Sequence, residues 1–321
     1  MRQVYKTTNT KSLTLYTFNK KENNMNIKIA LEWFVNPDHL PMLAGVVTGK
    51  YKEAGLEVEI IQPEEHYDGF EDLKSGNIDI HCNEPLHLFE HYFDGLKSLG
   101  CFFETRGGVM IRADRVDKLK ANGKIKITTP ASNPITNKIG FEIIKRYAQK
   151  NGFVIDRDNV EFVETDFWHI NNMKKDESFD GAWLCFYNFE GIEAEMEGFE
   201  NLFIDQFESP YPNFSALEFM STQETLDTKG EAICTFIDVT NQMAQYLQEN
   251  ILEAQSIFYD YTKEEHSELM DKIILDTIPR LEMDIKADGA RWKELYSFLE
   301  ELELVKLNDE EYANIWVAPK H

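Results

Sequence analysis

Four stretches of this chain carry side chains that could bind a small molecule, and in each an expected strand runs into a loop before an expected helix. Ligands in open α/β sheets bind beyond the carboxyl ends of the strands, where such loops gather. The first stretch follows the strand expected at 27–31 and contains Trp33, Asn36, Asp38 and His39. The indole offers a stacking face, and the polar side chains offer donors and acceptors. A core tryptophan followed by a polar helix cap fits the same residues, so both interpretations stay open.

The second stretch follows the strand expected at 78–81 and opens a helix. Asn83 and Glu84 stand near the start of that helix, where their polar groups either cap it or line a cleft. His87 and His91 are four residues apart and share a helix face, an arrangement that zinc can use. No second pair of ligands stands at a suitable spacing in the sequence, so we expect no metal site.

The third stretch lies between the strand expected at 125–128 and the helix expected at 134–151. Ser132, Asn133 and Thr136 bring small hydroxyl and amide groups to the start of this helix. Free backbone N–H groups at such a start can hold an anion or the polar head of a ligand. Because most residues of this kind serve only as caps, a ligand contact and a cap are both consistent with the pattern.

The fourth stretch follows the strand expected at 179–184 and leads into a helix that we expect to begin near residue 189. It contains Phe186, Tyr187 and Glu190. Aromatic faces beside one carboxyl group suit a flat heterocycle, because a carboxylate can pair with a ring nitrogen and an exocyclic amine at once. Core aromatics with a glutamate favoured by the helix dipole would give the same sequence.

Composition excludes several classes of function. The formal net charge is −24 and the acidic residues are spread along the chain, which argues against binding to nucleic acid or to anionic membranes. The sequence has no phosphate-binding loop, no nucleophile elbow and no dinucleotide-binding glycine motif, which disfavours kinase, hydrolase and dehydrogenase chemistry. The four cysteines are widely spaced and predict reduced thiols rather than disulfides: Cys82, Cys101, Cys185 and Cys234.

The first 24 residues are rich in Thr, Asn and Lys. They lack the continuous apolar core of a secretory signal, and no cysteine near the start could carry a lipid. We expect a disordered leader at 1–24, with Met25 as a candidate initiator, and a cytoplasmic protein. A periplasmic or surface location is the alternative if the chain starts elsewhere. No apolar run is long enough to span a bilayer, so we expect no membrane insertion.

Strand and helix patterns alternate through most of the chain, which predicts α/β architecture. A strand pair expected at 99–111 passes through Gly107 and Gly108, a candidate hinge or tight crossing. The irregular segment 208–213 is a second candidate crossing. Two crossings around a central block predict a discontinuous lobe at 25–107 plus 214–321 and an inserted lobe at 108–213, with a cleft between them. Beyond residue 220 we expect helices at 230–250, 251–259, 264–276 and 290–301.

Four segments together resemble a known family: LEWFVNPDH, GKYKEAGLEVEI, KSGNIDI and CFYNFEGIE. The resemblance covers roughly residues 26–221. It is to the family that joins the formylaminopyrimidine-binding protein of thiamine salvage to thiamine pyrimidine synthase. The implied fold is that of type II periplasmic binding proteins, two α/β lobes around a cleft, here followed by a helical C-terminal tail.

The resemblance also implies a binding site. It places Trp33, Asn36 and His39 in the wall of the first lobe, and Tyr187 and Glu190 in the second. Trp33 and Tyr187 would stack on an aminopyrimidine ring, and Glu190 would pair with its edge.

The synthase branch of the family builds the thiamine pyrimidine from pyridoxal phosphate and its own active-site histidine. His87 matches that histidine, but the lysine expected four residues earlier is Asn83. A cysteine-rich stretch of the synthases is also missing from the matching region at about 211–217. Without the lysine a Schiff base has no donor, so these departures favour binding over catalysis.

Our leading hypothesis is a protein that binds a thiamine-related aminopyrimidine, without a cofactor, in thiamine biosynthesis or salvage. An ABC-transporter permease is a candidate partner. The alternative is the synthase, with pyridoxal phosphate as cofactor and His87 as catalytic residue. A sensor or a sulfonate-type binding protein on the same fold is a third and weaker reading, because fold alone does not fix the ligand.

Overall fold

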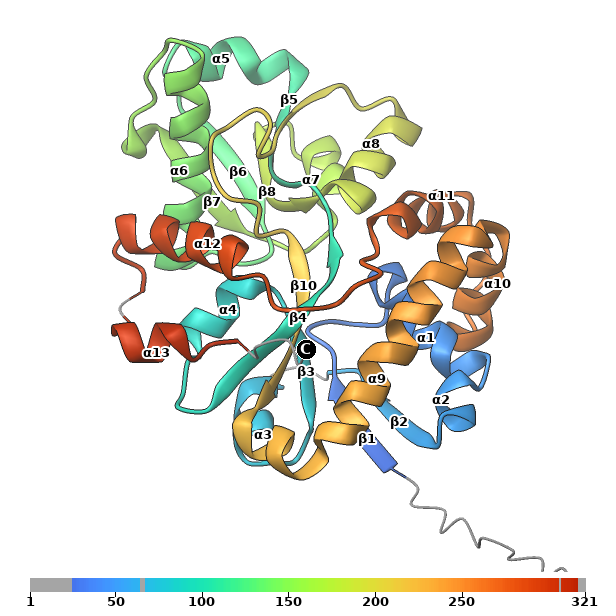
Figure 1. Cartoon of the computed structure of the whole chain (residues 1–321). Helices are drawn as coiled ribbons and strands as arrows, with labels where there is room; N and C mark the ends of the chain where they lie inside the picture. Colours follow the sequence, from blue (N-terminus) through green and yellow to red (C-terminus); the bar gives the residue numbers. More distant parts are fainter. Residues whose placement is uncertain (1–24, 64–66, 306, 317–321) are drawn as a thin grey trace, which may run out of the picture.

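Two five-stranded sheets, one above the other in Figure 1, form the scaffold of the residues that the computed structural model describes, 25–63, 67–305 and 307–316. The predicted disordered leader lies outside these residues. Strand order is β2-β1-β3-β10-β4 in the first sheet and β7-β6-β8-β5-β9 in the second. Both sheets mix parallel and antiparallel neighbours. The two-lobed α/β architecture predicted above is confirmed, whereas the exact lobe boundaries stay a prediction.

The first sheet combines strands from before and after the central part of the chain, and the second sheet consists of the five consecutive strands of that central part. The first sheet contains β1 (Met25–Ala30), β2 (Leu56–Ile61), β3 (Ile80–Asn83), β4 (Leu96–Glu104) and β10 (Ala216–Thr222). The second contains β5 (Gly107–Arg112), β6 (Ile125–Thr129), β7 (Val160–Glu164), β8 (Gly181–Phe186) and β9 (Asn201–Ile204).

Helices surround both sheets. Those before β8 are α1 (Leu40–Val47), α2 (Lys50–Glu53), α3 (Gly69–Lys74), α4 (Pro85–Glu90), α5 (Val116–Lys120), α6 (Pro134–Lys150) and α7 (His169–Lys175). Those after it are α8 (Ile192–Glu197), α9 (Gln223–Glu249), α10 (Ile251–Thr262), α11 (Glu268–Thr277), α12 (Gly289–Glu301) and α13 (Asp309–Ala313). Short 3-10 turns include η1 (Pro37–His39), and a π-helical turn, η4 (Tyr187–Gly191), follows β8.

The strand pair expected at 99–111 is not a hairpin. Its two halves are β4 in the first sheet and β5 in the second, because the chain passes from one sheet to the other between them. A Cβ on Gly107 would lie 1.8 Å from Ser215 Oγ, so the two crossing segments meet too closely for a side chain there. Thr105 N–H also donates to the Ser215 carbonyl at 2.9 Å. The glycine pair is therefore a tight crossing, as predicted.

Two strands are displaced by two residues from their predicted positions. The strand expected at 78–81 is β3, because the pairing of β3 with β10 extends to Asn83, opposite Glu218. The strand expected at 179–184 is β8, whose pairing with β5 extends to Phe186. The helix expected to begin near residue 189 starts instead as η4, which turns directly out of β8. Register with a neighbouring strand, which a single segment does not reveal, decides both shifts.

Helix boundaries in the C-terminal part differ from the predictions for a local reason. The helix expected at 230–250 begins seven residues earlier as α9, because the Thr222 hydroxyl caps it by accepting a hydrogen bond from Thr225 N–H at 3.1 Å. Lys229 has a φ of −124° inside this helix, and Gly230 follows at the kink. The helix expected at 264–276 is α11, whose start is set by a hydrogen bond from Met270 N–H to Ser267 Oγ.

The helix α12 joins the two sheets on one side of the molecule, between α6 and α4 (Figure 1). Trp292 packs edge-on against Phe89 of α4, with ring centroids 5.3 Å apart. At the other end, Glu301 forms an ion pair with Arg146 of α6 at 2.9 Å. None of the helices in the described residues combines the length and the apolar character that a membrane crossing needs.

Candidate functional site

The strand order of the first sheet locates a crevice for a ligand. From β1 the chain moves outward to β2, and from β2 it crosses back to β3 on the other side of β1. In open sheets of this kind, ligands bind beyond the carboxyl ends of the strands at the point where the order reverses. Here that point lies between β1 and β3, where Glu32 follows one strand and Cys82 and Asn83 end the other.

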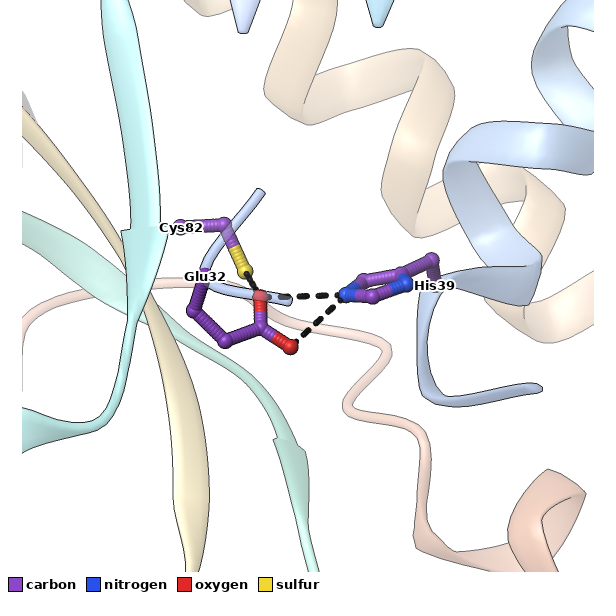
Figure 2. Close-up of side chains that lie close together, drawn as sticks. All are labelled: Glu32, His39 and Cys82. Atoms are coloured by element: carbon purple, nitrogen blue, oxygen red, sulfur yellow. Dashed lines mark hydrogen bonds and ion pairs between the residues drawn. The ribbon is translucent and has the colours of Figure 1, made fainter. Parts of the chain in front are cut away.

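Three side chains at this point form the Glu32 cluster, which consists of Glu32, His39 and Cys82 (Figure 2). His39 Nε2 lies 3.1 Å from both carboxyl oxygens of Glu32, and the Cys82 thiol donates to Oε2 at 3.0 Å. Burial alone would raise the pKa of Glu32, but His39 and Cys82 outweigh it and the pKa is lowered. The cluster therefore holds a buried carboxylate in its ionised form.

The orientation of His39 is set by the turn that precedes it. Asn36 caps η1 by accepting a hydrogen bond from Asp38 N–H at 2.9 Å. Asn36 N–H donates to His39 Nδ1 at 3.2 Å, which leaves the ring hydrogen on Nε2, facing Glu32. Asn36 and His39 were both predicted to contact a ligand. In the structure their polar groups form hydrogen bonds within the chain, and these bonds direct a donor toward the Glu32 carboxylate.

The Glu32 cluster has the side-chain types of a metal site, but the hydrogen on the His39 ring is on the wrong nitrogen for one. One ligand atom from each side chain lies within 4.8 Å of the others. A histidine that binds a metal through Nε2 normally donates a hydrogen from Nδ1 to a carbonyl or carboxylate. At His39 the neighbour of Nδ1 is the N–H of Asn36, itself a donor. The cluster is therefore better suited to hold protons than a cation.

A buried hydrogen bond connects the loop after β1 with the turn after β8. Asn188 in η4 donates through Nδ2 to Asp38 Oδ1 at 2.7 Å and to Thr277 Oγ1 at 3.0 Å. Burial, together with the charges of Glu32 and Glu190, raises the pKa of Asp38 well above its ordinary value. The first and fourth stretches singled out in the sequence therefore meet through Asp38, one of the polar side chains of the first stretch, and Asn188, which was not predicted as a ligand contact.

Glu190 is a second buried carboxyl group in this region. Its Oε2 accepts a hydrogen bond from Phe186 N–H at 2.7 Å. Burial raises the pKa of Glu190 to about 8, against the lowering effect of that hydrogen bond. Near neutral pH most of this side chain is a neutral carboxylic acid, which can donate through its hydroxyl and accept through its carbonyl.

Trp33 finds its aromatic neighbour in an unpredicted residue. Its ring lies 4.2 Å from that of Phe167, centroid to centroid, and Phe167 belongs to the loop after β7 in the second sheet. Tyr187 was predicted to stack on the ligand ring, as Trp33 was. One face of its own ring is covered by the Arg106 guanidinium at 3.6 Å, and its hydroxyl donates to Glu195. The two adjacent aromatic residues after β7, Phe167 and Trp168, were the available signal in the sequence.

The residues of the second stretch lie at the amino end of α4. Asn83 is hydrogen-bonded on both sides, to His81 Nε2 at 3.0 Å and from Glu84 N–H at 2.8 Å. Burial raises the pKa of Glu84 to about 7. His87 Nδ1 bonds Glu90 Oε2 at 2.9 Å. Because the amide of Asn83 cannot form a Schiff base, these residues do not fit pyridoxal phosphate in the way the synthases hold it.

The third stretch forms a helix cap. Asn133 Oδ1 accepts hydrogen bonds from the N–H groups of Ile135 and Thr136, and Thr136 Oγ1 accepts one from Asn133 N–H. Ser132 bonds the Phe162 carbonyl through its hydroxyl at 3.3 Å. Trp183 of β8 donates through Nε1 to the Thr136 carbonyl at 3.1 Å, but no hydrogen bond among the described residues joins Ser132, Asn133 or Thr136 to the candidate ligand contacts of the other three stretches. It borders a separate cavity of about 630 Å³, whose other walls include Lys138, Phe141, Arg157 and Leu302.

Known proteins share both the sequence pattern and the fold. The family model described as NMT1/THI5 like matches residues 36–254. A Haemophilus influenzae protein named for thiamine biosynthesis is 23% identical over 298 residues, 91% of each chain. A Legionella pneumophila protein named 4-amino-5-hydroxymethyl-2-methylpyrimidine phosphate synthase is 22% identical, with 87% of each chain covered.

Among solved structures, the periplasmic aliphatic sulphonate binding protein of Escherichia coli matches with a TM-score of 0.67 at 9% identity. The match covers 92% of this chain and 93% of that one. At this identity the likeness shows the fold alone, which is the periplasmic-binding-protein fold predicted from the sequence.

Proposed function

Because this chain belongs to the NMT1/THI5-like family, we propose that it binds an aminopyrimidine of the thiamine pathway, in the hydroxymethylpyrimidine or formylaminopyrimidine class. The proposed site lies between the two sheets, beside the carboxyl ends of β1, β3 and β8. Two relatives named for thiamine or pyrimidine biosynthesis align over most of their length, which supports this ligand class.

The observation that carries the proposal is the state of Glu190. Its carboxyl group is buried, and Oε2 accepts a single backbone N–H. An aminopyrimidine edge presents a ring nitrogen that accepts and an exocyclic amine that donates. A neutral carboxylic acid matches that edge with one donor and one acceptor. A carboxylate, which only accepts, pairs with both groups only when the ring nitrogen is protonated. Burial keeps the pKa of Glu190 at about 8, so the matching form predominates near neutral pH.

Two aromatic rings supply the rest of the proposed site. Trp33 from the first sheet and Phe167 from the second lie in contact, and a flat ligand that separates them would stack on both. Asn188 in η4 donates to Asp38 in η1, so a second contact joins the loop after β1 to the second sheet. Closing the lobes on a ligand would therefore bring aromatic faces and Glu190 to it together.

Titration calorimetry tests the proposal with hydroxymethylpyrimidine, its phosphate, formylaminopyrimidine, thiamine and pyridoxal phosphate. Selective binding of an aminopyrimidine is expected. Glu190→Ala should weaken that binding by about 1–3 kcal/mol, and Glu190→Gln by less, because an amide also offers one donor and one acceptor. Glu200→Gln, at an exposed carboxyl group ten residues further along the chain, is the control. Unchanged affinity in Glu190→Ala would overturn the assignment.

The synthase activity is the second candidate function, favoured by the similarity to the Legionella protein. It would use His87 and pyridoxal phosphate, although Asn83 stands where the resemblance expects the lysine. Mixing the protein with pyridoxal phosphate and borohydride, then mapping any modified lysine, tests it. A single labelled lysine would support the synthase.

We extend the proposal to location and partner. A cytoplasmic protein of thiamine biosynthesis is the first choice, and a periplasmic or surface protein that serves an ABC-transporter permease is the alternative. The fold of importer binding proteins supports the alternative. Cell fractionation of the native source with an antibody to this chain separates the two locations.

A further inference from the structure

A second cluster with metal-binding side chains lies on α4, outside the carboxyl groups discussed above. The His87 cluster consists of His87, Glu90 and His91, which stand at positions i, i+3 and i+4 and share one helix face. One ligand atom from each lies within 4.8 Å of the others. Two imidazoles and a carboxylate are a ligand set that Zn²⁺ uses, with water in a fourth position.

The His87 cluster is free to rearrange around an ion, unlike the Glu32 cluster. The side chains of His87 and Glu90 are 37% and 36% exposed, and His91 is exposed as well. His87 Nδ1 and Glu90 Oε2 are 2.9 Å apart. Ligand atoms at about 2.1 Å from a tetrahedral Zn²⁺ lie about 3.4 Å from each other. Side-chain rotation alone can therefore admit the ion, and the exposed position gives it a route of entry.

The ring of His91 packs against a neighbouring aromatic side chain. The His91 ring stacks on Phe70, with centroids 4.7 Å apart and planes at 6°. No hydrogen bond to the His91 ring occurs among the described residues.

We propose that His87, Glu90 and His91 form a Zn²⁺ site on the outer face of α4. This proposal does not depend on the aminopyrimidine. From the sequence we expected no metal, because the histidine pair has no second pair of ligands at a suitable spacing. In the structure Glu90 supplies a third ligand. The ion would replace the hydrogen bond between His87 and Glu90 and would tie the last turn of α4 together.

Titration calorimetry of the full chain without a histidine tag, with ZnCl₂ and no pyrimidine present, tests the site. We expect one Zn²⁺ per chain, and at least tenfold weaker binding in both Glu90→Gln and His91→Ala. His266→Ala is the matched control, because His266 is also exposed and lies 4.0 Å from a carboxylate, that of Asp271. It should bind Zn²⁺ as the parent chain does.

Co²⁺ as a spectroscopic probe distinguishes the two clusters. Ligation by His87, Glu90 and His91 predicts weak visible bands without the thiolate charge-transfer band that Cys82 would add. Binding that survives His91→Ala but is lost in Cys82→Ser would overturn the proposal, as would absence of Zn²⁺ binding. Aminopyrimidine binding is measured separately with a chelator present. That measurement tests the proposed function independently of the zinc site.

Discussion

Glu32 and Glu190 both follow the carboxyl end of a strand, yet the structure gives their carboxyl groups opposite properties. Glu32, after β1, is half-buried and receives hydrogens from an imidazole and a thiol, and its pKa is lowered although burial acts to raise it. Glu190, after β8, is buried and receives a backbone N–H from Phe186, and its pKa is raised to about 8. Burial acts to raise both pKa values, so the kind of donor decides which group is charged.

This difference assigns separate roles to the two lobes. The first lobe keeps a fixed negative charge at the switch point of its sheet, supported by the turn at Asn36 and His39. The second lobe presents a carboxyl group that can give up or keep its proton near neutral pH. A ligand that bridges the lobes would therefore meet a fixed charge on one side and an adjustable donor on the other.

The largest expected effect comes from removing the acceptor in the first lobe. Glu32→Ala leaves the His39 ring hydrogen and the Cys82 thiol buried without a partner. Each unsatisfied buried donor costs about 1–3 kcal/mol, so we expect the free energy of unfolding to fall by about 4 kcal/mol. Urea unfolding measures it, with the exposed Glu53→Ala as control, which should change by about 0.5 kcal/mol or less. A loss as small as the control's would contradict the hydrogen-bonded cluster.

The next effect concerns the proton on Glu190. In the unfolded chain this side chain ionises near its ordinary pKa of 4.5, but in the folded protein it keeps its proton up to about pH 8. The folded state therefore binds more protons in this window, and its stability falls as pH rises from about 5 to 8. Glu190→Gln removes this dependence. Between pH 6 and pH 8 we expect the free energy of unfolding of the variant to rise by about 2 kcal/mol relative to that of the parent chain.

Denaturant unfolding of both chains at several pH values measures that gain. A constant difference between them across the range would mean that Glu190 is already ionised in the folded protein. Glu195→Gln, whose partner is the Tyr187 hydroxyl on the protein surface, is the control for a neutralised acid in the same segment.

An effect of similar size is expected where the two regions join. Asn188→Ala removes the hydrogen bonds to Asp38 and Thr277. Because the buried carboxyl of Asp38 would lose its donor, we expect the unfolding free energy to fall by about 2 kcal/mol. Asn201→Ala, in which a mostly local hydrogen bond to the Phe199 carbonyl is lost, is the matched control. If both variants lost the same unfolding free energy, the hydrogen bonds of Asn188 between the lobes would contribute no more to stability than a local hydrogen bond does.

The smallest effect is expected at the half-exposed pair on α4. His87→Ala breaks the hydrogen bond with Glu90, but water can replace it on both sides. We expect a change in unfolding free energy of about 0.5 kcal/mol or less, in contrast to the buried pair at Glu32 and His39. Thermal unfolding in a metal-free buffer measures it. A loss of several kcal/mol would show that the histidine is a structural residue.

The sequence predicted the alternation of strands and helices and the tight crossing at Gly107 because these depend on local periodicity and on glycine. It also drew attention to Trp33 and Glu190. It did not predict that Asn36 would orient His39 toward Glu32 through a hydrogen bond. Nor did it predict that the aromatic partner of Trp33 would be Phe167. Those contacts join residues far apart in the chain or depend on which nitrogen of a ring carries the hydrogen.

By itself, the sequence determined the fold class, the family and the identity of the polar residues at strand ends, because pattern and motif are properties of short segments. Only the tertiary structure decided the chemical state of those residues. Glu32 and Glu190 are the same amino acid, and their pKa values separate because one is surrounded by donors from two segments and the other is buried with a single N–H. Burial and hydrogen-bond partners arise when distant segments meet, and these determine charge.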